Sequence, residues 1–167
     1  MTRDALESFR TFLGEPGWDD VVVGYDFGFL EPTQIQAWSA SQGNGPALAT
    51  LRGLGGPGLR DFEARLWEAC AEAAGKTPRP GSARWAHAQD RWRLAMLREA
   101  LATEATLPLL ARRVERLYEQ VGCPEDMLGM LRPSQPWSGL PAAVDAAGIL
   151  RFLDRHRAIP SLLVPAT

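Results

Sequence analysis

The side chains that most often bind metals or act as nucleophiles are scarce in this sequence. Its two histidines, His87 and His156, have no second histidine or cysteine at metal-ligand spacing. Cys70 and Cys123 belong to no C-x-x-C pair, and neither has a histidine close by in the sequence. We therefore expect reduced cysteines with packing roles, no bound metal or cofactor, and no catalytic residues.

Carboxylates are the remaining candidates for chemistry. Adjacent or near-adjacent acids occur at Asp19–Asp20, Asp61/Glu63 and Glu125–Asp126. Adjacent acids on a helix point in different directions, so solvent-facing groups are favoured over an acid–base pair. A site made of Asp19, Asp20 and Asp26 would suit a hard cation, but its spacing matches no known loop. The sequence thus predicts a protein that is not an enzyme.

An acidic and aromatic segment is the clearest anomaly. Residues 11–51 contain five acids and no basic residue, which leaves a balance of +3 for the rest of a chain whose net charge is −2. Each aromatic ring in this segment, taken singly, is more typical of a core. In combination, uncompensated carboxylates speed the encounter with a basic partner, and rings anchor an interface. The predicted partner-binding residues are Trp18, Asp19, Asp20, Tyr25, Asp26, Phe27, Phe29 and Glu31.

Arginines supply the alternative interface. Arg84, Arg91 and Arg98 are seven residues apart, so they line one side of a predicted helix, and three more arginines follow on the next helix. Residues 79–116 carry a balance of +4. This is mild for a nucleic-acid footprint, and pairs such as Asp90 with Arg93 would absorb part of it. Lys76 is the only lysine in the chain.

Hydrophobic periodicity, caps and breakers predict mostly helices. Helices are expected at about residues 3–13, 32–41, 46–52, 59–75, 82–101, 106–121, 124–131 and 142–157. Residues 21–29 are ambiguous, because three valines and alternating aromatic residues favour an extended segment. The segment 132–141 is expected to be irregular and the tail 159–167 extended. The sequence therefore predicts an all-α protein, one domain over residues 1–167, with about seven helices in an irregular array.

No apolar run approaches the length of about 20 residues that spans a bilayer, and the amphipathic, acid-containing start of the chain is not a signal peptide. We therefore expect a cytoplasmic protein that does not bind a membrane.

Three stretches resemble a known family. "YDFGFLEPTQIQAWS" resembles a motif with an aromatic residue, glycine, an aromatic residue, leucine and then proline. "RLYEQVGCPEDMLGMLRPSQP" resembles a Tyr-to-Pro-Glu segment that is followed by a proline, and "RWRLAMLREAL" resembles the basic, Trp-bearing helix before it. Together they resemble a bacterial family labelled as domain of unknown function 2247, over most of residues 24–136.

The resemblance implies a small helical protein of the kind often placed among immunity proteins of bacterial toxin systems. It supplies no catalytic residues. We therefore expect a non-enzymatic inhibitor that binds a cognate toxin, a basic catalytic domain, through the acidic and aromatic segment. The alternative is a regulatory or adaptor module that binds a host protein, or nucleic acid through the arginine-bearing helices.

Overall fold

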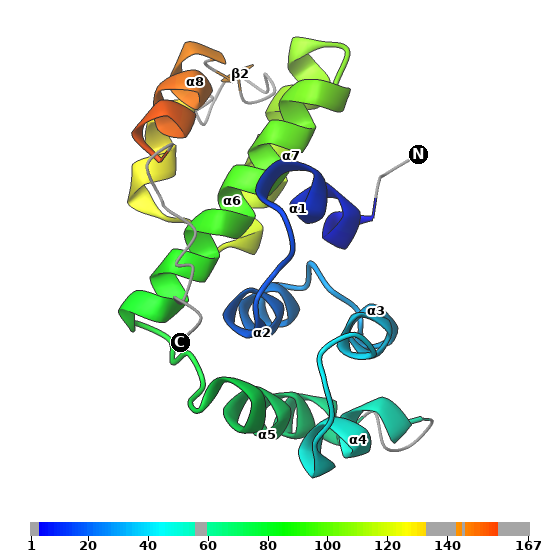
Figure 1. Cartoon of the computed structure of the whole chain (residues 1–167). Coiled ribbons are helices and arrows are strands. Elements are labelled where there is room, and N and C mark those ends of the chain that lie inside the picture. Colours follow the sequence, from blue (N-terminus) through cyan, green and yellow to red (C-terminus); the bar gives the residue numbers. More distant parts are fainter. Residues whose placement is uncertain (1–3, 56–59, 133–142, 145, 157–167) are drawn as a thin grey trace. The chain divides into compact units, whose positions relative to one another are not determined.

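The computed structural model describes residues 4–55, 60–132, 143–144 and 146–156, and this part of the chain is helical (Figure 1). Its elements are α1 (Ala5–Leu13), α2 (Trp18–Asp26), α3 (Pro32–Ser39), α4 (Pro46–Gly53), α5 (Phe62–Ala74), α6 (Ala83–Thr103), α7 (Leu107–Gln120), the 3-10 helix η2 (Glu125–Met130), β1 (Leu131–Arg132), β2 (Ala143–Val144) and α8 (Ala146–Arg155). The two strands form a two-residue antiparallel ladder, with Leu131 opposite Val144. The all-α prediction is confirmed.

Backbone contacts divide the chain into two compact units, residues 1–96 and residues 97–167. Helix α6 is continuous across the boundary, since it runs from Ala83 to Thr103. The expectation of a single domain over residues 1–167 stays a prediction.

Unit 1 contains α1 to α5 and the first part of α6. Helix α5 packs along α4 and also contacts α2, while α3 packs against α4 (Figure 1). Its buried apolar side chains include Phe9, Val21, Val22, Val23, Ile35, Trp38, Leu51, Phe62, Leu66 and Trp92. Phe62, Leu66 and Cys70, which are spaced four residues apart on α5, form the buried face of that helix.

The extended segment expected near residues 21–29 is wrong, because residues 18–26 form helix α2. The backbone N–H of Gly17 donates to the Asp20 side chain at 2.7 Å, which fixes the first turn. Acids in that turn are favoured by the helix dipole. The three valines are all buried, and their burial outweighs the small helix-propensity cost of β-branching.

The end of α2 depends on Gly28. This residue has a φ of +70°, a conformation that glycine adopts without steric cost. The chain then turns back, so that the N–H of Phe29 donates to the Gly24 carbonyl at 2.8 Å. This turn carries Phe27 and Phe29 off the helix and onto neighbouring elements.

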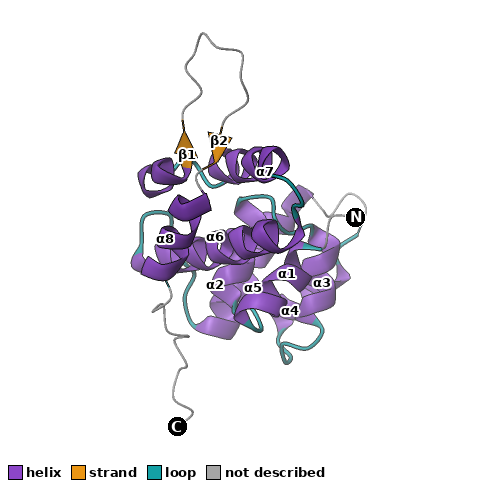
Figure 2. Ribbon diagram, turned by 90° about the horizontal axis from the view of Figure 1, so that it is seen from above, coloured by secondary structure: helices purple, strands orange, loops and turns teal. Residues whose placement is uncertain are grey.

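Unit 2 contains the end of α6 followed by α7, η2, β1, β2 and α8. Helix α7 contacts the strand pair, and α8 packs on η2 (Figure 2). Its buried apolar side chains include Leu97, Leu110, Val114, Leu117, Met127, Met130, Ile149 and Phe152. The short helix predicted at residues 124–131 is present as η2.

The remaining predicted helices are found within a few residues of their expected bounds. The tail 159–167 and all but the first residue of the segment 132–141 lie outside the described residues. In the described ranges, no helix combines the length and the apolar character needed to cross a membrane.

Candidate functional site

Asp19 is held by an arginine from a distant part of the sequence. Arg84, on α6, donates from Nε to Oδ2 of Asp19 at 2.7 Å and from Nη2 to Oδ1 at 2.5 Å. Such two-bond contacts between guanidinium and carboxylate are among the stronger charge-assisted hydrogen bonds. Arg84 also donates to the Lys76 carbonyl at 3.1 Å, so its side chain ties the loop after α5 to α2.

Asp20 is buried, with only 2% of its surface exposed. Its Oδ2 accepts from the Gly17 backbone at 2.7 Å and from Nη1 of Arg91 at 2.6 Å. Burial raises the pKa of Asp20 to about 6, although the charge of Arg91 acts in the opposite direction. The carboxyl group therefore serves the fold and is not available to a partner.

The expectation of uncompensated charge is therefore wrong for Asp19 and Asp20. Their cations lie on α6, 65 and 71 residues further along the chain, so a count within residues 11–51 does not include them. Glu15 is also paired, through two hydrogen bonds of 2.9 Å from Arg10. Glu15, Asp19 and Asp20 are thus paired within the protein, and the other two acids of residues 11–51 are Asp26 and Glu31.

Two of the predicted rings are half-buried against tryptophans. Trp18 meets Trp38 edge to face, with the ring centroids 4.9 Å apart. Phe29 stacks on Trp92 at 5.0 Å with an interplanar angle of 15°. These two rings stabilise unit 1, in accord with the core role that a single ring most often has.

Tyr25 and Phe27 are half-buried at the contact of α2 with α5 and α6. Tyr25 packs on Phe62 with centroids 5.3 Å apart, and Phe27 packs on Trp85 at 6.1 Å. Trp85 in turn stacks on Trp67 of α5, at 6.4 Å and 9°. The half-exposed rings of Phe27 and Trp67 are thus linked through Trp85, while Tyr25 packs separately on Phe62.

Three acids close to Tyr25 are exposed: Asp26 follows it in the sequence, and Glu31 and Glu63 act on it through their charges. Partial burial, and then the charge of Glu63, raise the pKa of Asp26. Partial burial, and then the charges of Glu63 and Glu31, raise the pKa of Tyr25. Across the part of the chain that the structure describes, no lysine, arginine or histidine forms an ion pair with these three acids.

We call this surface the α2–α5 patch. It comprises Tyr25, Asp26, Phe27, Glu31, Glu63 and Trp67. Glu63 and Trp67 are four residues apart, so they share one face of α5, and α5 contacts α2. The patch combines acids that lack a cationic partner with rings that keep part of their surface in solvent.

Reasoning from the sequence missed Glu63 and Trp67, which lie outside the acidic segment. From the sequence alone, Glu63 is only one member of the pair of nearby acids Asp61/Glu63. The four-residue spacing between Glu63 and Trp67 was a local signal, but it does not indicate that α5 contacts α2.

Several arginines of residues 79–116 form ion pairs with acids of the protein itself. Besides Arg84 and Arg91, Arg93 pairs with Asp90, and Arg113 of α7 reaches the buried Glu99 at 2.6 Å. These pairs reduce the positive charge that a nucleic acid would meet.

The two cysteines differ in their exposure to solvent. Cys70 is buried, and this burial raises the pKa of its thiol to about 12. Cys123 is exposed, contrary to the expected packing role. The described residues include no group of three or more histidines, cysteines and acids arranged to hold a metal ion.

No family model, no curated protein and no solved structure matches the chain.

Proposed function

We propose that this protein is a protein-binding inhibitor, of the kind that neutralises a cognate bacterial toxin, and that it docks through the α2–α5 patch. The observation that carries the proposal is that α2 and α5 contact each other and carry the exposed acids Asp26 and Glu63; partial burial, and then repulsion by the charge of Glu63, raise the pKa of Asp26. This repulsion is not relieved by a cation of the described residues, so a basic partner surface would relieve it.

The aromatic rings of the α2–α5 patch can serve as anchors for a partner. Tyr25 and Trp67 are half-exposed, and Trp67 is held in place by its stacking on Trp85. Aromatic anchors that are already oriented cost little ordering entropy on binding. An arginine or lysine of the toxin can lie against such a ring while it pairs with a carboxylate.

Inhibition then follows from steric occlusion. Toxin domains that act on nucleic acids carry positive charge in the active-site cleft, and an acidic, ring-bearing surface is complementary to such a cleft. The electrostatic field speeds encounter, and the bound helices block substrate access. No group of the inhibitor takes part in a chemical step.

The first test is co-purification with the toxin encoded immediately upstream, combined with a growth assay. We expect the toxin to be retained by this protein and to lose its toxicity on co-expression. Toxicity that persists in cells containing both proteins would contradict the inhibitor role.

The second test addresses the surface. Charge reversal by Asp26→Lys together with Glu63→Lys should lower the association rate constant roughly tenfold at low salt and flatten its salt dependence. The matched control is Glu119→Lys, which reverses an exposed acid on α7. Stopped-flow or surface-based kinetics provide the measurement, and circular dichroism checks that the variants are folded.

If the double variant and the control associate at the same rate, the α2–α5 patch is not the interface, and only the inhibitor role would survive. Asp19 and Asp20 are unsuitable for this test because reversing either charge breaks an ion pair within unit 1.

A further inference from the structure

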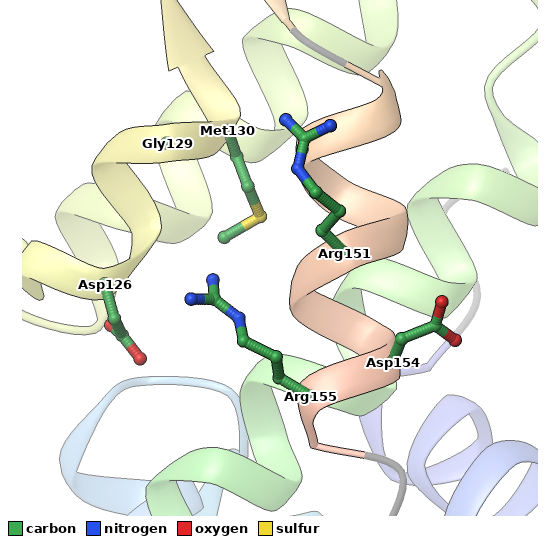
Figure 3. A pocket seen from close by; sticks show the side chains of 7 residues that line it. Asp126, Gly129, Met130, Arg151, Asp154 and Arg155 are labelled. Atoms are coloured by element: carbon green, nitrogen blue, oxygen red, sulfur yellow. The ribbon is translucent and has the colours of Figure 1, made fainter.

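Unit 2 contains a pocket between η2 and α8 that shares no residue with the α2–α5 patch. Its volume is about 450 Å³, and its walls are formed by Asp126, Gly129 and Met130 of η2 and by Gly148, Arg151 and Arg155 of α8 (Figure 3). Asp154 also lines it. This volume lies within the range of about 300–1,000 Å³ that is typical of small-molecule sites.

The two walls are held together by a close backbone approach. A Cβ atom on Gly148 would lie 2.5 Å from the Gly129 carbonyl oxygen, so only glycine fits there. Met130, Ile149 and Phe152 are buried beside this contact. The pocket is therefore bounded by elements that are packed against each other, rather than by a loop.

The cationic groups of the pocket come from one face of α8. Arg151 and Arg155 are four residues apart and both extend toward η2, with the Met130 side chain reaching in from the opposite wall (Figure 3). Arg155 is exposed, and it has no hydrogen bond or ion pair with any residue that the structure describes. Its planar guanidinium group is thus available for a two-bond contact with an oxyanion.

The charge of the lining limits which anion fits. Two arginines and two aspartates line the pocket, so their formal charges cancel. A dianion such as a phosphate monoester would gain from the arginines but would be repelled by Asp126 and Asp154. A single carboxylate needs only one guanidinium fork, and an apolar chain attached to it would contact Met130.

We propose that this pocket binds a small molecule with one carboxylate group, held by Arg155, and with an apolar portion placed over Met130. The proposal does not depend on the toxin-inhibitor function and concerns a different unit of the chain.

The test uses the full chain, with hexanoate as the probe and its neutral isostere hexanamide as the matched ligand control. Titrations are followed by the backbone amide resonances of Gly129, Met130 and Gly148. We expect saturable shifts with hexanoate at millimolar concentrations. Hexanamide should bind at least roughly tenfold more weakly, because it lacks the charge that Arg155 recognises.

The protein variants separate the pocket from general charge effects. Arg155→Ala should weaken hexanoate binding roughly tenfold, while Arg155→Lys, which keeps the charge but loses the fork, should give an intermediate value. Arg112→Ala removes an exposed arginine of α7 and should leave binding unchanged. Equal binding of hexanoate and hexanamide, equal losses in Arg155→Ala and Arg112→Ala, or the absence of saturable shifts would each overturn the proposal.

Discussion

Asp20 has two roles at once, since it caps the start of α2 and neutralises Arg91. Both roles place it in the interior of unit 1, where its surface is 2% exposed. An isolated ionised carboxylate would be costly at such a site, and the hydrogen bonds from Gly17 and Arg91 offset part of that cost. Burial nevertheless raises its pKa from 3.8 to about 6.

This pKa shift predicts a pH-dependent stability. The folded protein binds the Asp20 proton more tightly than the unfolded chain, so the contribution of this group is greatest below pH 3.8 and is lost as the pH rises through about 6. The free energy of unfolding of the wild type, relative to Asp20→Asn, should therefore fall between about pH 4 and pH 7, by up to about 3 kcal/mol. Urea unfolding at a series of pH values measures this difference.

The asparagine keeps an oxygen that can accept from Gly17, so the comparison isolates the charge. Glu119→Gln, at an exposed position, is the control and should show no such trend. A difference that increases with pH would mean that the attraction of Arg91 outweighs burial.

At the scale of helices, the contact between α2 and α6 depends on the absence of a side chain at Gly24. A Cβ atom there would lie 2.5 Å from Cζ2 of Trp92. The Trp92 ring is fully buried, stacks on Phe29 and contacts Phe9. Its Nε1 donates to the Asp20 carbonyl at 2.6 Å, so the ring has little freedom to move aside.

Gly24→Ala should consequently destabilise the protein by about 1–3 kcal/mol, although alanine is the better helix former. The matched control is Gly53→Ala in α4, where no atom lies within 4 Å of the added Cβ. The control should be neutral or stabilising by up to about 1 kcal/mol. Denaturant unfolding measures both, and a Gly24→Ala variant as stable as the control would show that Trp92 can repack.

The same helices show what sequence patterns can predict. The stripe of Phe62, Leu66 and Cys70 repeats every four residues, and this local information was sufficient to predict α5. Three consecutive valines resemble a strand, so the sequence does not predict α2; the burial of these valines belongs to the packing of unit 1, in which α2 contacts α5 and Gly24 lies against Trp92 of α6. Likewise, the neutralisation of Asp19 depends on Arg84, a pairing that no pattern within residues 11–51 indicates.

The partner-binding residues predicted from the sequence include four of the six residues that define the α2–α5 patch, namely Tyr25, Asp26, Phe27 and Glu31. Whether they bind a partner stays a prediction.

At the scale of the whole chain, the continuity of α6 bears on cooperativity. The helix contributes residues to both compact units, so the unfolding of either unit exposes part of one helix that the other unit also uses. We expect a single thermal transition in which the calorimetric and van't Hoff enthalpies agree. Gly24→Ala and Gly148→Ala, one in each unit, should both lower its midpoint. Two transitions, each moved by only one variant, would contradict the expectation of one domain.

Lys76 is the only lysine of the chain, and it is exposed just beyond the end of α5, where its carbonyl accepts from Arg84. Glu63 lies in the first turn of that helix, about 20 Å away at the rise of an α-helix. An amine-reactive fluorophore or surface linker has therefore a single side-chain attachment point in this protein. Trp67, the patch residue nearest to that point along α5, lies about 13 Å from it at the rise of an α-helix, so a fluorophore on Lys76 would report on docking at the edge of the patch.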